Sequence, residues 1–182
     1  MSDLESILCR APLGRLLQLA YVVLDLESAA HRYARAFGLG PWSVYTLQPP
    51  ALRDRMYRGA AGTFSMRIAL ADDETGLSHE LISPLAGPSI YSEFLDRQGR
   101  GLHHAAFQIG TSLDEATEAL SRLGAGVAMS GRWNEIRFAY LDGGPLEGFV
   151  EIWEMPAGHQ LPRPDRQIFG APSVGVSSVR PE

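Results

Sequence analysis

One stretch decides how this chain folds: Gly101-Leu102-His103-His104-Ala105-Ala106-Phe107-Gln108-Ile109. Its apolar, aromatic and small residues predict a β-strand, in which successive side chains point to opposite faces. His103 and the apolar residues at every second position after it would share one face, which we expect to pack against the core. His104, Ala106 and Gln108 would share the other face, where the small Ala106 leaves room beside the imidazole of His104. A single histidine on a strand is more often structural than a metal ligand, so His104 alone defines no site.

The same pattern occurs earlier in the chain, from Leu16 to Gly40. This segment can be placed over Leu102 to Gly126 without a gap, and residue types match where the elements are defined. The matched pairs are Gln18 with His104, Ala20 with Ala106, Tyr21 with Phe107, Val23 with Ile109, Ala30 with Ala116, Phe37 with Leu123, Gly38 with Gly124 and Gly40 with Gly126. Each copy predicts a strand, a helix and a glycine stop, followed by about three strands. Two such βαβββ modules would pack into one curved mixed sheet around a cleft, which is an α+β fold.

Local signals give the bounds of the elements. Asp25 is expected to cap a helix over 26–37, and Ser112 with Glu115 has the spacing of a capping box for a helix that ends near Leu123. Short helices are expected at 4–9 and 89–98. Strands are expected at 16–24, 42–47, 64–70, 79–82, 127–132, 136–141 and 148–154. The segment with Arg53, Arg55 and Arg58 reads as a solvated loop.

These elements divide the chain into four parts. We predict an N-terminal extension over 1–15, a first module over 16–100, a second module over 101–155 and an irregular Pro/Gly/Ser-rich tail over 156–182. The net charge of −5 and the lack of a basic run exclude nucleic acid and membrane as expected partners. The single cysteine, Cys9, excludes an internal disulfide, and we assign it no role. The acidic start of the chain predicts a cytoplasmic protein.

The repeat also pairs polar residues. Glu80-Leu81-Ile82-Ser83-Pro84 resembles Glu151-Ile152-Trp153-Glu154 before Pro156, so both final strands carry a glutamate at matching positions. A pseudo-two-fold axis would bring one amide, one imidazole and two carboxylates to a common concave face. Carboxylates within apolar strands are costly unless they are paired or coordinated, which favours a metal site. The alternative is that both glutamates face solvent at strand ends.

From Leu16 to Met155 the chain resembles the vicinal oxygen chelate superfamily, which includes glyoxalase I, methylmalonyl-CoA epimerase, ring-cleaving dioxygenases and bleomycin-resistance proteins. The most specific part runs from Glu80-Leu81-Ile82-Ser83-Pro84-Leu85 to Gly101-Leu102-His103-His104. The resemblance implies that Gln18, Glu80, His104 and Glu151 are metal ligands. Methylmalonyl-CoA epimerases carry histidine where this chain has Gln18, but the set of ligand types is similar to that of eukaryotic-type glyoxalase I.

One imidazole and three oxygen ligands suit a divalent ion, either zinc, nickel, cobalt, manganese, magnesium or iron. The ion would act as a Lewis acid on a small carbonyl or acyl substrate, with Glu151 as general base and Glu80 as the alternative. The resemblance thus implies an isomerase, an epimerase or a glyoxalase-like lyase, and we also expect a homodimer. Candidate substrate-binding residues are Trp42, Tyr45, Phe64, Met66, Arg67, Arg137, Tyr140 and Trp153, each with a structural alternative in the core or in a surface ion pair.

Two other functions remain open. A metal-free module that sequesters a small molecule, as bleomycin-resistance proteins do, is favoured by Gln18 and by a final strand that is one residue short between Gly148 and Glu151. An iron ring-cleaving dioxygenase is less expected, because such sites typically use two histidines and one glutamate. The fold alone does not decide among these functions.

Overall fold

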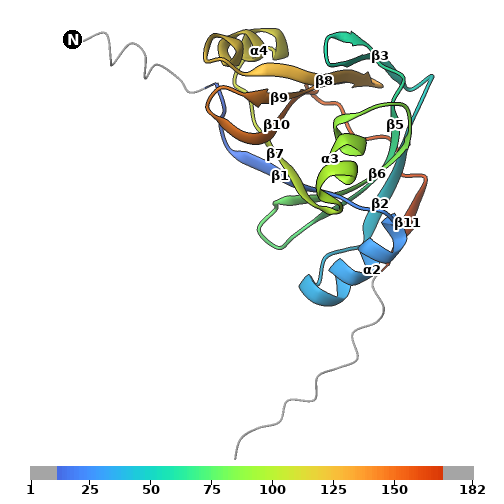
Figure 1. The fold of residues 1–182 in the computed structure, drawn as a ribbon. Coiled ribbons are helices and arrows are strands. Elements are labelled where there is room, and N and C mark those ends of the chain that lie inside the picture. Colours follow the sequence, from blue (N-terminus) through green and yellow to red (C-terminus); the bar gives the residue numbers. More distant parts are fainter. Residues whose placement is uncertain (1–11, 170–182) are drawn as a thin grey trace, which may run out of the picture.

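Two antiparallel strands, β1 (Leu16–Val22) and β7 (Gly101–Phe107), form the centre of the sheet (Figure 1). The computed structural model describes residues 12–169, and within them eleven strands form one sheet in the order β11-β2-β5-β6-β1-β7-β10-β9-β8-β3-β4. The strands beyond β1 are β6 (Ser78–Ala86), β5 (Ser65–Asp72), β2 (Trp42–Leu47) and β11 (Arg166–Ile168). The strands beyond β7 are β10 (Leu146–Glu154), β9 (Ile136–Gly143), β8 (Gly126–Trp133), β3 (Leu52–Tyr57) and β4 (Ala60–Ala61).

The two halves of the sheet are built alike. β1 pairs in parallel with β6, and β7 pairs in parallel with β10. Ala20 lies opposite Glu80, just as Ala106 lies opposite Glu151. In the central pair, Gln18 lies opposite Ala106 and His104 opposite Ala20, so the register is unchanged when the halves are exchanged. The α+β fold expected from the sequence repeat is therefore confirmed.

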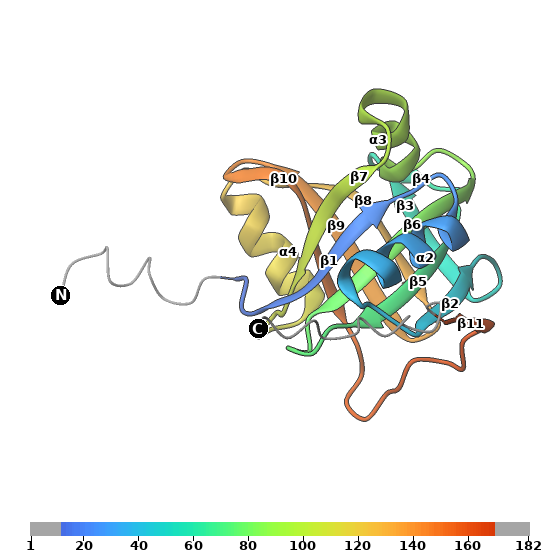
Figure 2. The same cartoon turned by 90° about the horizontal axis from the view of Figure 1, so that it is seen from below.

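Three helices accompany the sheet within the described residues. α2 (Leu26–Phe37) and α4 (Leu113–Arg122) pack on its outer side, at opposite ends (Figure 2). Asp25 caps α2 by accepting a hydrogen bond from the amide of Ser28, and Ser112 and Glu115 form the expected capping box of α4. α3 (Ile90–Gln98) buries Ile90 and Tyr91 against the inner face of the sheet. The helix expected at 4–9 lies outside the described residues.

The sheet curves so strongly that side chains from its two distant flanks meet. The rings of Tyr45 on β2 and Trp133 on β8 lie 5.2 Å apart, although these strands stand near opposite ends of the strand order. Their inner faces share one buried cluster with α3, whereas α2 and α4 each cover a separate cluster on the outer side. The curvature therefore creates an interior that side chains from both halves line.

Two sequence expectations about the edges of the sheet are wrong. The arginine-rich segment is not a loop, because strand β3 pairs with the edge of β8 and buries Leu52 there. The tail is not wholly irregular, because β11 adds to the edge of β2 and buries Ile168 against the cluster beneath α2. Both added strands form hydrogen bonds with backbone groups that would otherwise be unpaired at an edge of the sheet. No local sequence pattern predicts such pairing. No helix in residues 12–169 combines the length and the apolar character that crossing a membrane requires.

Candidate metal site

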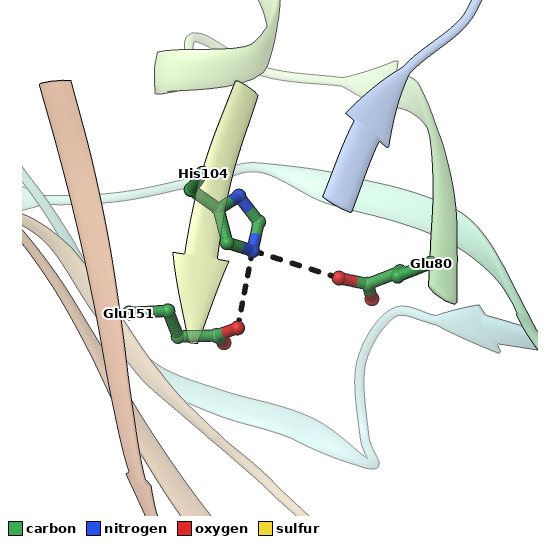
Figure 3. A group of neighbouring side chains, drawn as sticks. All are labelled: Glu80, His104 and Glu151. Atoms are coloured by element: carbon green, nitrogen blue, oxygen red, sulfur yellow. Dashed lines mark hydrogen bonds and ion pairs between the residues drawn. The ribbon is translucent and has the colours of Figure 1, made fainter. Parts of the chain in front are cut away.

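Three buried side chains, from β6, β7 and β10, point toward one another across the centre of the sheet (Figure 3). Nε2 of His104 on β7 lies 3.1 Å from Oε2 of Glu151 on β10 and 3.7 Å from Oε2 of Glu80 on β6. Each of the three residues exposes less than a tenth of its surface. Ligand atoms about 2 Å from one ion lie about 3 to 4 Å apart, so these distances fit a shared divalent cation.

The register of the sheet brings these residues together, but a bulge decides how the imidazole lies. Ala20 pairs with His104 and Tyr21 with Leu102, so His103 is an extra residue in β7. A bulge of this kind re-aims side chains. As a result, the Nδ1 atoms of His103 and His104 lie 2.9 Å apart. The expectation that strict alternation separates these two imidazoles is therefore wrong, as is the expectation that the Ala105 side is the more buried one.

Hydrogen bonding assigns the protons of the two imidazoles. Nε2 of His103 donates to the carbonyl oxygen of Ile90 at 3.4 Å, because a carbonyl can only accept. Burial, followed by the charge of His104, lowers the pKa of His103 to about 3, so this ring is neutral at pH 7. Its Nδ1 must then accept a hydrogen bond from Nδ1 of His104. Nε2 of His104 is left facing two carboxylates, an arrangement that needs a proton or a metal cation in between.

The carboxylate of Glu80 is buried with one oxygen atom, Oε2, that accepts no hydrogen bond from the described residues. Burial, followed by the charge of Glu151, raises the pKa of Glu80 well above its usual value. An ionised carboxylate in such a place is stable only if a cation compensates it. The residues present therefore fit a divalent metal ion, with Glu80, His104 and Glu151 as ligands.

A cavity of about 180 Å³ opens beside these residues. Gln18, Glu80 and Glu151 line it, whereas the side chain of His104 lies behind them with no exposed surface. Gln18 therefore shares the cavity with both glutamates, as the sequence repeat predicts, and its role as a fourth ligand stays a prediction.

The expected substrate-binding residues divide into two groups. Met66, Tyr140 and Trp153 line the cavity. The other five do not line it: Tyr45 and Phe64 are buried in the inner cluster, Trp42 packs beneath α2, and Arg67 and Arg137 form ion pairs on the outer side. The two arginines thus form ion pairs, which is the alternative role that the sequence left open for them.

Other residues of the site were missed from the sequence. Ile68 on β5 and Phe138 on β9 line the cavity, and each stands two residues from a predicted member of the site. Strand alternation could have found both. Trp133 also lines the cavity, but no spacing links it to the predicted residues. His103 was assigned to packing, because its contact with His104 depends on the bulge.

The family of the chain follows from comparison with known proteins. The model of the Glyoxalase/Bleomycin resistance protein/Dioxygenase superfamily matches residues 17–140, which is more than half of the chain. The chain therefore belongs to this superfamily, and the resemblance seen in the sequence is confirmed. Comparison with curated protein sequences finds no match.

Solved structures with the same fold include methylmalonyl-CoA epimerases. The enzyme from Mycobacterium tuberculosis has 20% sequence identity and a TM-score of 0.57, and the match covers 80% of this chain and 90% of that one. A methylmalonyl-CoA epimerase in complex with methylmalonyl-CoA and NH4+ has 18% identity, a TM-score of 0.53, and coverage of 80% and 96%. The hypothetical protein BH1468 from Bacillus halodurans C-125 has 18% identity, a TM-score of 0.54, and coverage of 81% and 98%. These likenesses establish the fold.

Proposed function

We propose that this protein is a divalent-metal-dependent isomerase or epimerase that removes a proton from a carbon next to a carbonyl group. The observation that carries the proposal is the meeting of one imidazole nitrogen and two buried carboxylates, one of them with an unpartnered oxygen, at the wall of a cavity. Glu80, His104 and Glu151 would hold the ion, with Gln18 as a fourth ligand. The ion would stabilise negative charge on the carbonyl oxygen of the substrate as a Lewis acid.

The two glutamates divide the proton chemistry. Glu151 accepts the proton from the carbon, and the electron pair of the C–H bond moves to the carbonyl oxygen to give an enolate. Return of a proton to the same carbon from the opposite side gives the epimer. Glu80 is the candidate for this second role, and it would leave the ion to carry that proton. The pseudo-two-fold relation of the two residues supports such an arrangement, since their strands flank the central pair on opposite sides.

Tyr140 assists at the wall of the same cavity. Burial, followed by the charge of Glu151, raises the pKa of Tyr140 well above its usual value. The phenol therefore keeps its proton at neutral pH and can donate a hydrogen bond to the substrate oxygen on which charge develops. The apolar residues around it exclude water from the reacting carbon.

Metal analysis of the purified protein, followed by a solvent-deuterium exchange screen, tests the proposal. We expect one divalent ion per chain after dialysis, and exchange at the carbon next to the carbonyl in a member of a panel of 2-oxo and acyl-CoA compounds. Replacing Glu151→Gln should abolish exchange, whereas Glu147→Gln, an exposed glutamate on the same strand, should leave it unchanged. A protein that retains no metal would instead support the metal-free binding module, and unchanged exchange in Glu151→Gln would refute the assignment of the base.

A further inference from the structure

Away from the candidate metal ligands, the walls of the cavity are apolar. Leu47, Met66, Ile68, Trp133, Phe138 and Trp153 contribute to them. The polar side chains among the lining residues include the amide of Gln18, the hydroxyls of Ser78 and Tyr140, and the carboxylates of Glu80 and Glu151. Within residues 12–169, no arginine or lysine lines this cavity. Among the described lining residues, the only side chains with formal charges are therefore the two carboxylates that we assign to the metal.

Strand alternation keeps two guanidinium groups that neighbour lining residues out of the cavity. Arg67 stands between Met66 and Ile68 on β5, but its side chain pairs with Glu27 of α2 on the outer side of the sheet. Arg137 stands between two cavity residues on β9, and it binds Asp114 of α4 at 2.6 Å and Glu154 at 3.2 Å. Neither arginine can reach a ligand in the cavity without breaking these ion pairs and passing through its own strand.

A carboxylate on a bound compound would find no cationic side chain among the described walls. It would lose its hydration against aliphatic and aromatic side chains, which costs much more than a hydrogen bond returns unless a cation is near. Glu80 and Glu151 would in addition repel it. The cavity therefore selects against anionic groups everywhere except where a metal ion would sit.

The volume of the cavity indicates the size of the apolar group that it can enclose. Apolar cavities of about 150 Å³ lined by Leu, Ile and Phe bind benzene. A volume of about 180 Å³ thus accommodates a body the size of a substituted benzene ring. The indole and phenyl rings of Trp133, Trp153 and Phe138 offer faces and edges for aromatic contact with such a body.

We propose that the substrate is an uncharged carbonyl compound with an apolar body the size of a substituted benzene ring. This inference rests on the proposed function for the reacting carbonyl, and it names the class of compound on which that function acts. Methylmalonyl-CoA, bound in one of the structures with the same fold, carries a free carboxylate on its acyl group and lies outside this class.

Two isosteric ketones test the inference by binding alone. 4-Nitroacetophenone and 4-acetylbenzoate have the same shape, but only the second carries a carboxylate at the end distant from the carbonyl. Isothermal titration calorimetry in EDTA should give a dissociation constant at least about tenfold lower for the nitro compound, because the carboxylate must be desolvated against apolar walls without a cation beside it. Equal or tighter binding of 4-acetylbenzoate would overturn the proposal, and so would the absence of binding by both ketones.

A charge placed at the edge of the cavity provides an independent measurement. Leu161 lines the cavity yet is 43% exposed, so Leu161→Arg adds a guanidinium with little disturbance of the core. The preference for the nitro compound should shrink about threefold, as an exposed ion pair permits. The matched control Leu123→Arg, at an exposed leucine outside the cavity, should leave the preference unchanged. An unchanged preference in Leu161→Arg as well would count against this cavity as the binding site.

Metal analysis, combined with the ketone measurement, distinguishes failure of this inference from failure of the proposed function. If metal analysis finds no ion and the nitro compound is still preferred, the proposed function fails and the substrate class stands. If metal analysis finds the ion and the preference measured in EDTA is absent, the proposed function stands and the substrate class falls.

Discussion

Replacing Glu80→Gln should stabilise the metal-free protein and destabilise the metal-bound one. In the metal-free protein, Oε2 of Glu80 is buried without a hydrogen-bond partner, and the charge of Glu151 adds to the cost of ionising it. A buried polar group left unsatisfied costs about 1–3 kcal/mol, so the amide should raise the free energy of unfolding by about that amount at pH 7. For a chain of this size, each kcal/mol corresponds to a Tm change of about 2–4 °C.

With metal bound, the wild type should be more stable than the Glu80→Gln variant. An ion at about 1,000 times its dissociation constant adds about 4.1 kcal/mol to the wild type, which exceeds the advantage of the variant and corresponds to a Tm increase of about 8–16 °C. The variant lacks one anionic ligand and should respond much less. Differential scanning fluorimetry measures the Tm of both proteins in EDTA and with zinc, nickel, cobalt, manganese or magnesium. The control Glu147→Gln should have the Tm of the wild type under both conditions.

The pH dependence in EDTA provides a check of the same reasoning. Because the pKa of Glu80 is raised on folding, the folded protein binds the proton more tightly than the unfolded chain does. The wild type should therefore lose stability relative to the variant as the pH rises above about 4.3, and the two should converge below that pH. A variant that is less stable than the wild type in EDTA at pH 7 would refute the argument, since the carboxylate would then have a favourable partner.

Three further predictions concern the surroundings of the site. Replacing His103→Phe keeps a ring against Phe149 but removes the acceptor for Nδ1 of His104, so chelator competition should show metal affinity about 10–100-fold weaker, with part of the loss restored in His103→Gln. The pKa of Asp73 is lowered to about 2, chiefly by the hydroxyl of Thr75, so Asp73→Asn should lower the Tm at pH 6, and this difference should vanish as the pH falls toward 2; a constant difference would contradict the assignment. Arg137→Gln should cost at most about 1 kcal/mol in urea unfolding and leave ketone binding unchanged, because its ion pairs lie outside the cavity; weaker binding would place the guanidinium near the ligand.

The sequence by itself determined the repeated architecture and the residues that meet in its centre. Helix bounds followed from signals within a few residues, such as Asp25 before α2 and the capping box of α4. The pairing of Gln18 with His104, and of Glu80 with Glu151, followed from the repeat, because two copies of one unit related by a pseudo-two-fold axis place matching residues symmetrically.

Only the tertiary structure decided how the imidazole of His104 is held and which residues line the cavity. The bulge at His103 arises from pairing with a strand far away in the sequence, so alternation within β7 could not reveal it. In the same way, alternation along β5 and β9 places Arg67 and Arg137 on the opposite face of the sheet from the residues next to them. It does not reveal which of the two faces lines a cavity. That choice depends on the curvature of the whole sheet and on the helices that cover its outer side, which are properties of packing between distant segments rather than of any local pattern.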